Sequence, residues 1–158
     1  MTTPHFPVIG GTIDIMTPFL LAALGGLYSS LAGVLNIALE GLMIFSAFFS
    51  IVVTVATGNL FLGILGGVLA TLLLTALFGS IALGLRANIF ICGLATNLLA
   101  SALSIVLSLS FYGQTGSVSF PDMPVLKPIA IPFLMKIPVV GDVLSGHNIL
   151  VYVSWLLL

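Results

Sequence analysis

Residues 60–85 read LFLGILGGVLATLLLTALFGSIALGL, and this stretch decides the fold. It contains no charged residue and exceeds the roughly 20 apolar residues that an α-helix needs to cross the hydrocarbon core of a bilayer. Residues 13–29, 35–56 and 89–111 form three further apolar stretches, and residues 148–158 form a fifth of about half the length. We therefore predict four membrane-spanning helices and a truncated fifth.

The composition of the whole chain indicates the same class. Apolar residues make up 60% of the 158 residues and charged residues 4%, whereas a typical soluble domain is about 25% charged. We predict an all-α, polytopic transmembrane helical bundle that forms one domain over residues 1–158. The net charge of −1 argues against nucleic-acid binding. Cys92, the single cysteine, cannot form an internal disulfide or a metal cluster and is predicted to be a small apolar filler in a helix.

Small residues recur at four-residue spacing within the predicted spans. In lipid, helices gain no hydrophobic energy by associating, so small residues at this spacing favour close contact between helix backbones. The pattern predicts a tight bundle rather than isolated anchors. The pairs are Ala22/Gly26, Gly63/Gly67 and Gly66/Ala70.

Residues 112–147 differ from the rest of the chain because they are rich in proline and contain both lysines. Prolines at this density exclude a continuous helix, so we predict a long loop on one membrane face, with short helical turns near Phe133. The last stretch, 148–158, ends without a polar flank, and we interpret the chain as the N-terminal part of a longer one.

Glu40 is the single charged residue between Asp14 and Arg86. A charge at the centre of a bilayer costs about 2.5–3.5 kcal/mol on insertion scales, so an ionisable group there is a functional hypothesis. If a helix starts at residue 35, Asn36 and Glu40 share one face and Glu40 lies near the membrane surface. Arg86 ends the third span on the same membrane side, so an Arg86–Glu40 ion pair and two independent interfacial charges are both compatible with the sequence.

The remaining polar residues of interest are two asparagines and two histidines. Asn88 flanks the fourth span and Asn97 lies inside it, and both are predicted to hydrogen-bond across helices. A structural link is the favoured role, and contact with a polar solute is the alternative. His5 and His147 lie outside the spans and have no metal-ligand partner at a useful spacing, so both are predicted to be surface residues. No nucleophile, phosphate-binding or zinc motif is present, and neither a cofactor nor a metal is expected.

Several short motifs, in this order, resemble one family. They are TPFLLAALGG (residues 17–26), LAGVLNIALEGLM (31–43), LRAN (85–88), GLATNLLA (93–100) and IPVVG (137–141). The chain resembles the permease subunits of ABC importers in the branched-chain amino acid and simple sugar group. The resemblance is strongest to nucleoside and simple-sugar permeases that work with lipoproteins of the basic-membrane-protein type, and it covers essentially the whole chain.

The resemblance implies a multi-pass subunit of the cell membrane that forms part of a translocation path and is not itself an enzyme. Its implied partners are ATP-binding cassette ATPase subunits, a second permease subunit, an extracytoplasmic substrate-binding lipoprotein and the lipid bilayer. The Arg86 loop would be cytoplasmic, and both the proline-rich loop and the N-terminus would be external. Asn36, Glu40 and Gly41 would belong to a family motif used for gating or helix packing.

Two other functions stay open on the sequence alone. Nothing in the chain matches the cytoplasmic loop with which the family's permeases dock on their ATPase. A truncated or non-transporting membrane scaffold is therefore one alternative. The other is an ion-coupled carrier that uses Glu40 as a proton site.

Overall fold

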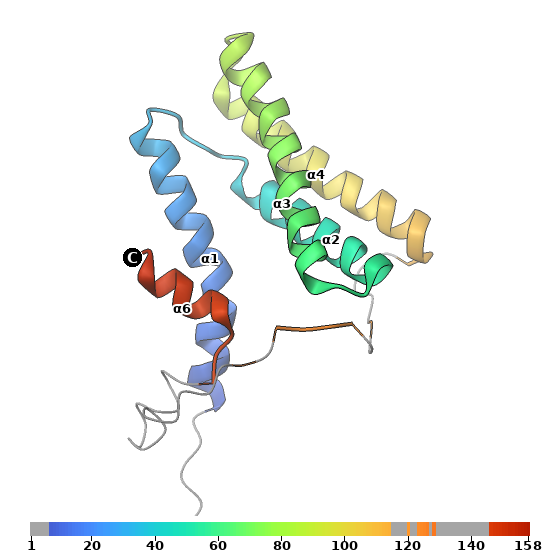
Figure 1. Ribbon diagram of the computed structural model, residues 1–158. Coiled ribbons are helices and arrows are strands. Elements are labelled where there is room, and N and C mark those ends of the chain that lie inside the picture. Colours follow the sequence, from blue (N-terminus) through green and yellow to red (C-terminus); the bar gives the residue numbers. More distant parts are fainter. Residues whose placement is uncertain (1–6, 115–119, 121–122, 127, 129–145) are drawn as a thin grey trace, which may run out of the picture. The chain divides into compact units, whose positions relative to one another are not determined.

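The computed structural model describes residues 7–114, 120, 123–126, 128 and 146–158. They contain the helices α1 (Pro7–Leu31), α2 (Leu39–Thr57), α3 (Leu60–Gly79), the π-helix η1 (Ser80–Gly84), α4 (Ile89–Tyr112) and α6 (Ile149–Leu156) (Figure 1). The all-α fold predicted from the sequence is confirmed. The predicted loop around Phe133 and the position of His5 lie outside the described residues.

Within the described residues, four helical stretches are long and apolar enough to cross a membrane: Gly11–Leu31, Leu39–Thr57, Leu60–Gly84 and Ile89–Tyr112. Each corresponds to one of the four predicted spans. The third span has no break, but its last turn is a π-helix: α3 continues directly into η1. Such π-type turns are rare, and they occur frequently at functional sites.

The chain divides into two compact units, which we describe separately. Within the larger unit, α2 and α3 form a tight antiparallel hairpin (Figure 1). Gly58 ends α2 in the left-handed region at φ 65°, and the Asn59 side chain accepts a hydrogen bond from the Phe61 N–H at 2.9 Å to start α3. A glycine at the helix end and an asparagine N-cap are the residues that this turn favours.

Glycines hold α2 and α3 close together. A Cβ placed at Gly67 would lie 2.8 Å from the Ser46 carbonyl oxygen, and one at Gly66 would lie 2.7 Å from a Val53 methyl group. Gly63 faces Thr54 in the same way. The close contact predicted for Gly63 and Gly67 is confirmed, and it brings backbones close enough for packing to replace the missing hydrophobic drive.

The buried apolar side chains of this unit gather where α2, α3 and α4 meet. Large apolar side chains also cover the outer faces of these helices: Leu73 of α3 is 75% exposed and Leu98 of α4 is 73% exposed. Exposed apolar faces of this kind are what membrane-spanning helices present to lipid or to neighbouring helices, so the exposure agrees with membrane spans. The core consists of Ala38, Leu42, Phe45, Ala70, Leu74, Phe78, Ala82 and Ala100.

Candidate functional site

The polar residues singled out by the sequence gather around the start of α2. After α1, the backbone turns at Gly33, whose φ is 83° and whose N–H donates to the Ser30 carbonyl at 2.9 Å. The chain then runs without helical structure to Asn36, whose Oδ1 accepts from the Ala38 N–H at 3.1 Å. Because α2 begins at Leu39 and not at residue 35, the predicted shared helix face of Asn36 and Glu40 is wrong. Asn36 instead stabilises the turn that precedes the helix.

Asn97 of α4 binds the start of α2 with both ends of its side-chain amide. Its Oδ1 accepts from the Gly41 N–H at 2.7 Å, and its Nδ2 donates to the Ile37 carbonyl at 3.0 Å. The N-cap residue of α2, Ala38, has no side chain that could accept a bond from the first turn. Asn97 therefore caps α2 from a neighbouring helix, and the interhelical hydrogen bonding predicted for Asn97 is confirmed. We call Asn97, Ile37 and Gly41 the Asn97 clasp.

The clasp requires that α2 and α4 approach closely. A Cβ at Gly41 would lie 2.7 Å from the Asn97 Cα and 3.1 Å from the Ala100 Cβ. Four residues before Asn97, a Cβ at Gly93 would lie 2.9 Å from the Ile37 Cβ. Each helix thus contributes one glycine at the contact, and the two glycines let the amide reach backbone groups directly.

Glu40 lies in the first turn of α2 and is exposed. A carboxylate at this end of a helix interacts favourably with the helix dipole. Among the described residues, no ion pair joins Glu40 to Arg86. The reason is an offset along the hairpin: contacts such as Gly63 with Thr54 place Glu40 near residue 76 of α3, so Arg86 lies about ten residues, or roughly 15 Å, further along. The tip of the α3–α4 hairpin extends past the start of α2 (Figure 1).

Arg86 and Asn88 belong instead to the turn between η1 and α4. Arg86 is exposed and adopts a φ of 54°, which is uncommon for a residue other than glycine. The Asn88 Oδ1 accepts from the N–H groups of Phe90 at 2.9 Å and Ile91 at 3.3 Å. Asn88 is thus the N-cap of α4, and the predicted bond from Asn88 to another helix is wrong, because its own helix already offers donors without partners.

In the smaller unit, His147 and Asp14 form an unexpected contact. His147 Nδ1 lies 2.9 Å from Asp14 Oδ1, and the side chains are 3% and 45% exposed respectively. The prediction that His147 is a surface residue is wrong, because its ring is buried, contacts Asp14 of α1 and lies edge-on to Trp155 of α6. The sequence analysis did not identify this pair, because no local pattern links two residues that are 133 positions apart. The rarity of charged residues in the chain is the signal that could have drawn attention to Asp14.

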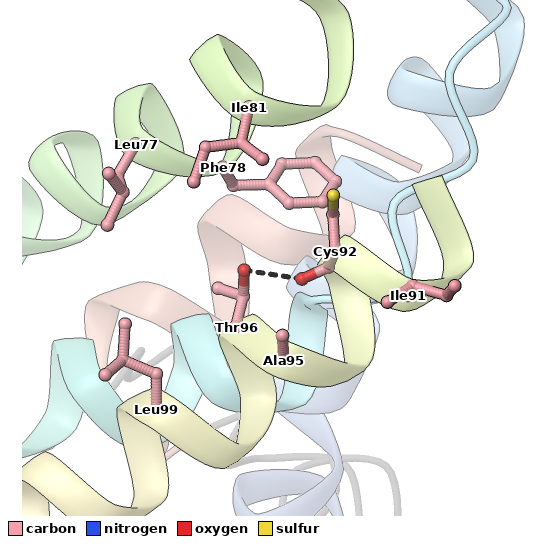
Figure 2. A pocket seen from close by; sticks show the side chains of 8 residues that line it. All are labelled: Leu77, Phe78, Ile81, Ile91, Cys92, Ala95, Thr96 and Leu99. Atoms are coloured by element: carbon pink, nitrogen blue, oxygen red, sulfur yellow. Dashed lines mark hydrogen bonds between the residues drawn. The ribbon is translucent and has the colours of Figure 1, made fainter. Parts of the chain in front are cut away.

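An apolar cavity of about 180 Å³ lies between α4 and the end of the third span (Figure 2). The Cys92 thiol and the Phe78 ring face it, and the Thr96 hydroxyl donates to the Cys92 carbonyl at 2.8 Å. Cys92 is half-buried beside the core, as predicted for a small filler. Within the part of the chain that the structure describes, no three His, Cys, Asp or Glu residues are grouped to hold a metal ion.

Comparisons with known proteins give one consistent result. Residues 9–158 match the family model for the permease component of branched-chain amino acid transport systems. The chain is 31% identical over 142 residues to a nucleoside ABC transporter permease of Lactococcus lactis and 30% identical over 165 residues to a guanosine ABC transporter permease of Bacillus subtilis. It is 34% identical over 139 residues to a Haloferax volcanii protein that is provisionally named a glucose ABC transporter permease.

These matches cover 85–96% of the chain but 40–51% of the three relatives. The chain therefore spans about half the length of the curated relatives that it matches. No solved structure matches the chain.

Proposed function

This chain belongs to the permease family of branched-chain amino acid transport systems, and from that premise we propose that it forms part of the translocation path of an ATP-driven importer. It is a multi-pass protein of the cell membrane. The observation that carries the proposal is that the family match runs through all four apolar helices. The names of the relatives make nucleosides or simple sugars the proposed solutes.

The proposed partners follow from the same family. ATP would be hydrolysed by separate ATPase subunits, and a second permease subunit would complete the path. An extracytoplasmic binding lipoprotein would deliver the solute. We propose that the turn at Arg86 faces the cytoplasm and that residues 112–147 form an external loop within a permease domain of residues 1–158. In this arrangement the transport subunit itself performs no catalysis.

Within this function, we assign the Asn97 clasp to helix packing. The start of α2 is fixed by hydrogen bonds that involve Asn36, Gly41 and Asn97. The start of α4 is fixed by its N-cap, Asn88. Glu40 and Arg86 are exposed next to these fixed turns and are therefore placed to contact other subunits or lipid headgroups. The exposed position of Glu40 in the first turn gives no support to a buried proton site.

The test is uptake of radiolabelled guanosine and glucose in cells that carry the complete transporter. We expect uptake to require both this chain and an ATPase subunit that can hydrolyse ATP. Deleting the gene for this chain should abolish uptake of at least one of the two solutes. Uptake that persists with a hydrolysis-deficient ATPase would overturn the proposal in favour of an ion-coupled carrier. Uptake that is unchanged without this chain would favour a non-transporting scaffold.

A further inference from the structure

Asp14 and His147 are an ionisable pair inside a chain that has few charges. Asp14 lies near the start of the apolar helix stretch Gly11–Leu31, and His147 is almost completely buried against it. Ionisable side chains in membrane-spanning segments are costly, and they commonly mark the pathways of solutes and ions. Asp14 is one of only seven formally charged residues in the sequence.

The geometry orients the Asp14 carboxylate without using all of its acceptor capacity. An ionised carboxylate offers about four lone-pair sites on its two oxygens. The contact between His147 Nδ1 and Asp14 Oδ1, at 2.9 Å, uses one of these sites. Because the Asp14 side chain is 45% exposed, further acceptor sites can be reached from outside while the buried histidine limits rotation of the carboxylate.

Aromatic rings lie beside His147 on the α6 side. The Trp155 ring lies edge-on to the His147 ring, with centroids 6.3 Å apart, and edge-on to the Tyr152 ring at 5.8 Å. Asn148, next to His147, has a buried side-chain oxygen without a hydrogen-bond partner among the described residues. The His147 ring thus contacts both the half-exposed Asp14 carboxylate and half-buried aromatic surface. An acceptor close to aromatic surface is the chemistry that holds a ligand with hydroxyl groups and an apolar ring.

We propose that Asp14, positioned by His147, whose ring lies beside Trp155, binds adjacent hydroxyl groups of the transported solute, as in a ribose or a hexose. Two neighbouring hydroxyls can donate to the two oxygens of one carboxylate, whereas a 2′-deoxynucleoside lacks one of the donors. The inference rests on the proposed function and names the solute chemistry at one end of the path. The competing explanation is that the pair only ties α1 to the turn before α6.

The experiment compares guanosine with 2′-deoxyguanosine in the complete transporter. In the Asp14→Asn variant, we expect the KM for guanosine to rise at least about tenfold, because the solute loses one hydrogen bond to a charged group. The KM for 2′-deoxyguanosine should change less than about twofold. His147→Gln should raise the guanosine KM by a smaller factor, because it keeps a donor but loses the rigid ring. Met16→Leu, an exposed apolar change on the same helix, is the matched control and should change neither KM.

A purely structural tie would alter both solutes equally, and an unchanged ratio of the two KM values would overturn the inference. This outcome is separate from failure of the proposed function, in which the unmodified transporter would take up neither guanosine nor glucose. If Asp14→Asn prevents assembly, fluorescence decides. Trp155 is the single tryptophan of this sequence, so its emission can be followed while the purified chain in nanodiscs is titrated with each nucleoside. The concentration of guanosine that changes the Trp155 emission should be at least about tenfold lower than the concentration of 2′-deoxyguanosine that does so. Equal responses to the two nucleosides would overturn the proposal.

Discussion

The contacts of α2 with α3 and with α4 hold the same helix by different means. The α2–α3 contact depends on shape, because Gly63, Gly66 and Gly67 let the two backbones approach. The α2–α4 contact depends on two hydrogen bonds from one side chain, Asn97, although Gly41 and Gly93 supply the necessary space. Packing is spread over several turns of a hairpin, whereas the clasp is concentrated at one helix end. We therefore expect larger side chains at the glycines to disrupt the α2–α3 contact, and removal of the Asn97 amide to disrupt the α2–α4 contact.

Gly63→Leu should have the largest effect, because its Cβ alone would overlap the Thr54 side chain and lie 2.8 Å from the Ser50 carbonyl oxygen. Overpacking of a close contact typically costs about 1–3 kcal/mol and occasionally more, and we expect a value at the upper end. Resistance to unfolding by SDS in bicelles measures the change. Gly79→Leu is the matched control, since a Cβ at Gly79 meets nothing within 4 Å. Equal losses in the two variants would contradict the role of shape.

Gly41→Ala tests both kinds of contact at once. The new methyl group would lie 2.7 Å from the Asn97 Cα, which is backbone and cannot rotate away, and it would displace the amide from the Gly41 N–H. We expect a loss of about 2 kcal/mol in the same unfolding measurement. Gly25→Ala on α1, where a Cβ also meets nothing within 4 Å, should cost nothing. A neutral Gly41→Ala variant would mean that α2 and α4 are not tightly joined.

Asn97→Ala removes the clasp without adding bulk. The Gly41 N–H and the Ile37 carbonyl lose their partner, and interhelical hydrogen bonds in membranes contribute about 0.6 kcal/mol each on average. We expect destabilisation of about 1–2 kcal/mol, and faster hydrogen exchange at the Gly41 amide should report it directly. Leu98→Ala, at an adjacent position that is 73% exposed, provides the comparison. If both variants exchange at the same rate, Asn97 does not cap α2.

Exchanging the charges of Glu40 and Arg86 should have the smallest effect on stability. Both side chains are exposed and form no ion pair with each other in the described structure, so each single reversal and the double exchange should stay within about 0.5 kcal/mol. A double-mutant cycle on the unfolding free energy measures the coupling between them. A coupling above about 1 kcal/mol would show that the two charges meet in the membrane.

Much of the fold could be predicted from composition and the lengths of apolar runs. The four spans were found because crossing a bilayer demands long uncharged helices, and Gly63 and Gly67 were found because close helix packing in lipid demands small residues. Asn97 was identified as an interhelical donor because a buried amide in lipid needs a partner. Its partners could not be predicted, since they are the backbone groups of Ile37 and Gly41. Every residue carries such groups, so the sequence does not distinguish these two from the others.

The errors also have physical causes. Asn36 is four residues before Glu40, but a turn stabilised by its own side chain precedes the helix and removes the expected shared face. Asn88 has donors within its own helix and so does not bind another one. The burial of His147 was missed because it depends on contact with α1, which lies at the other end of the sequence.

By itself, the sequence determined that this chain lies in a membrane, where its helices run and to which permease family it is similar, because those properties depend on local composition and on the order of short motifs. The tertiary structure decided which polar groups meet. It placed Asn97 at the start of α2, separated Arg86 from Glu40 along the hairpin, and joined His147 to Asp14. These pairings depend on helix register and on contacts over long sequence separations, which no local pattern encodes.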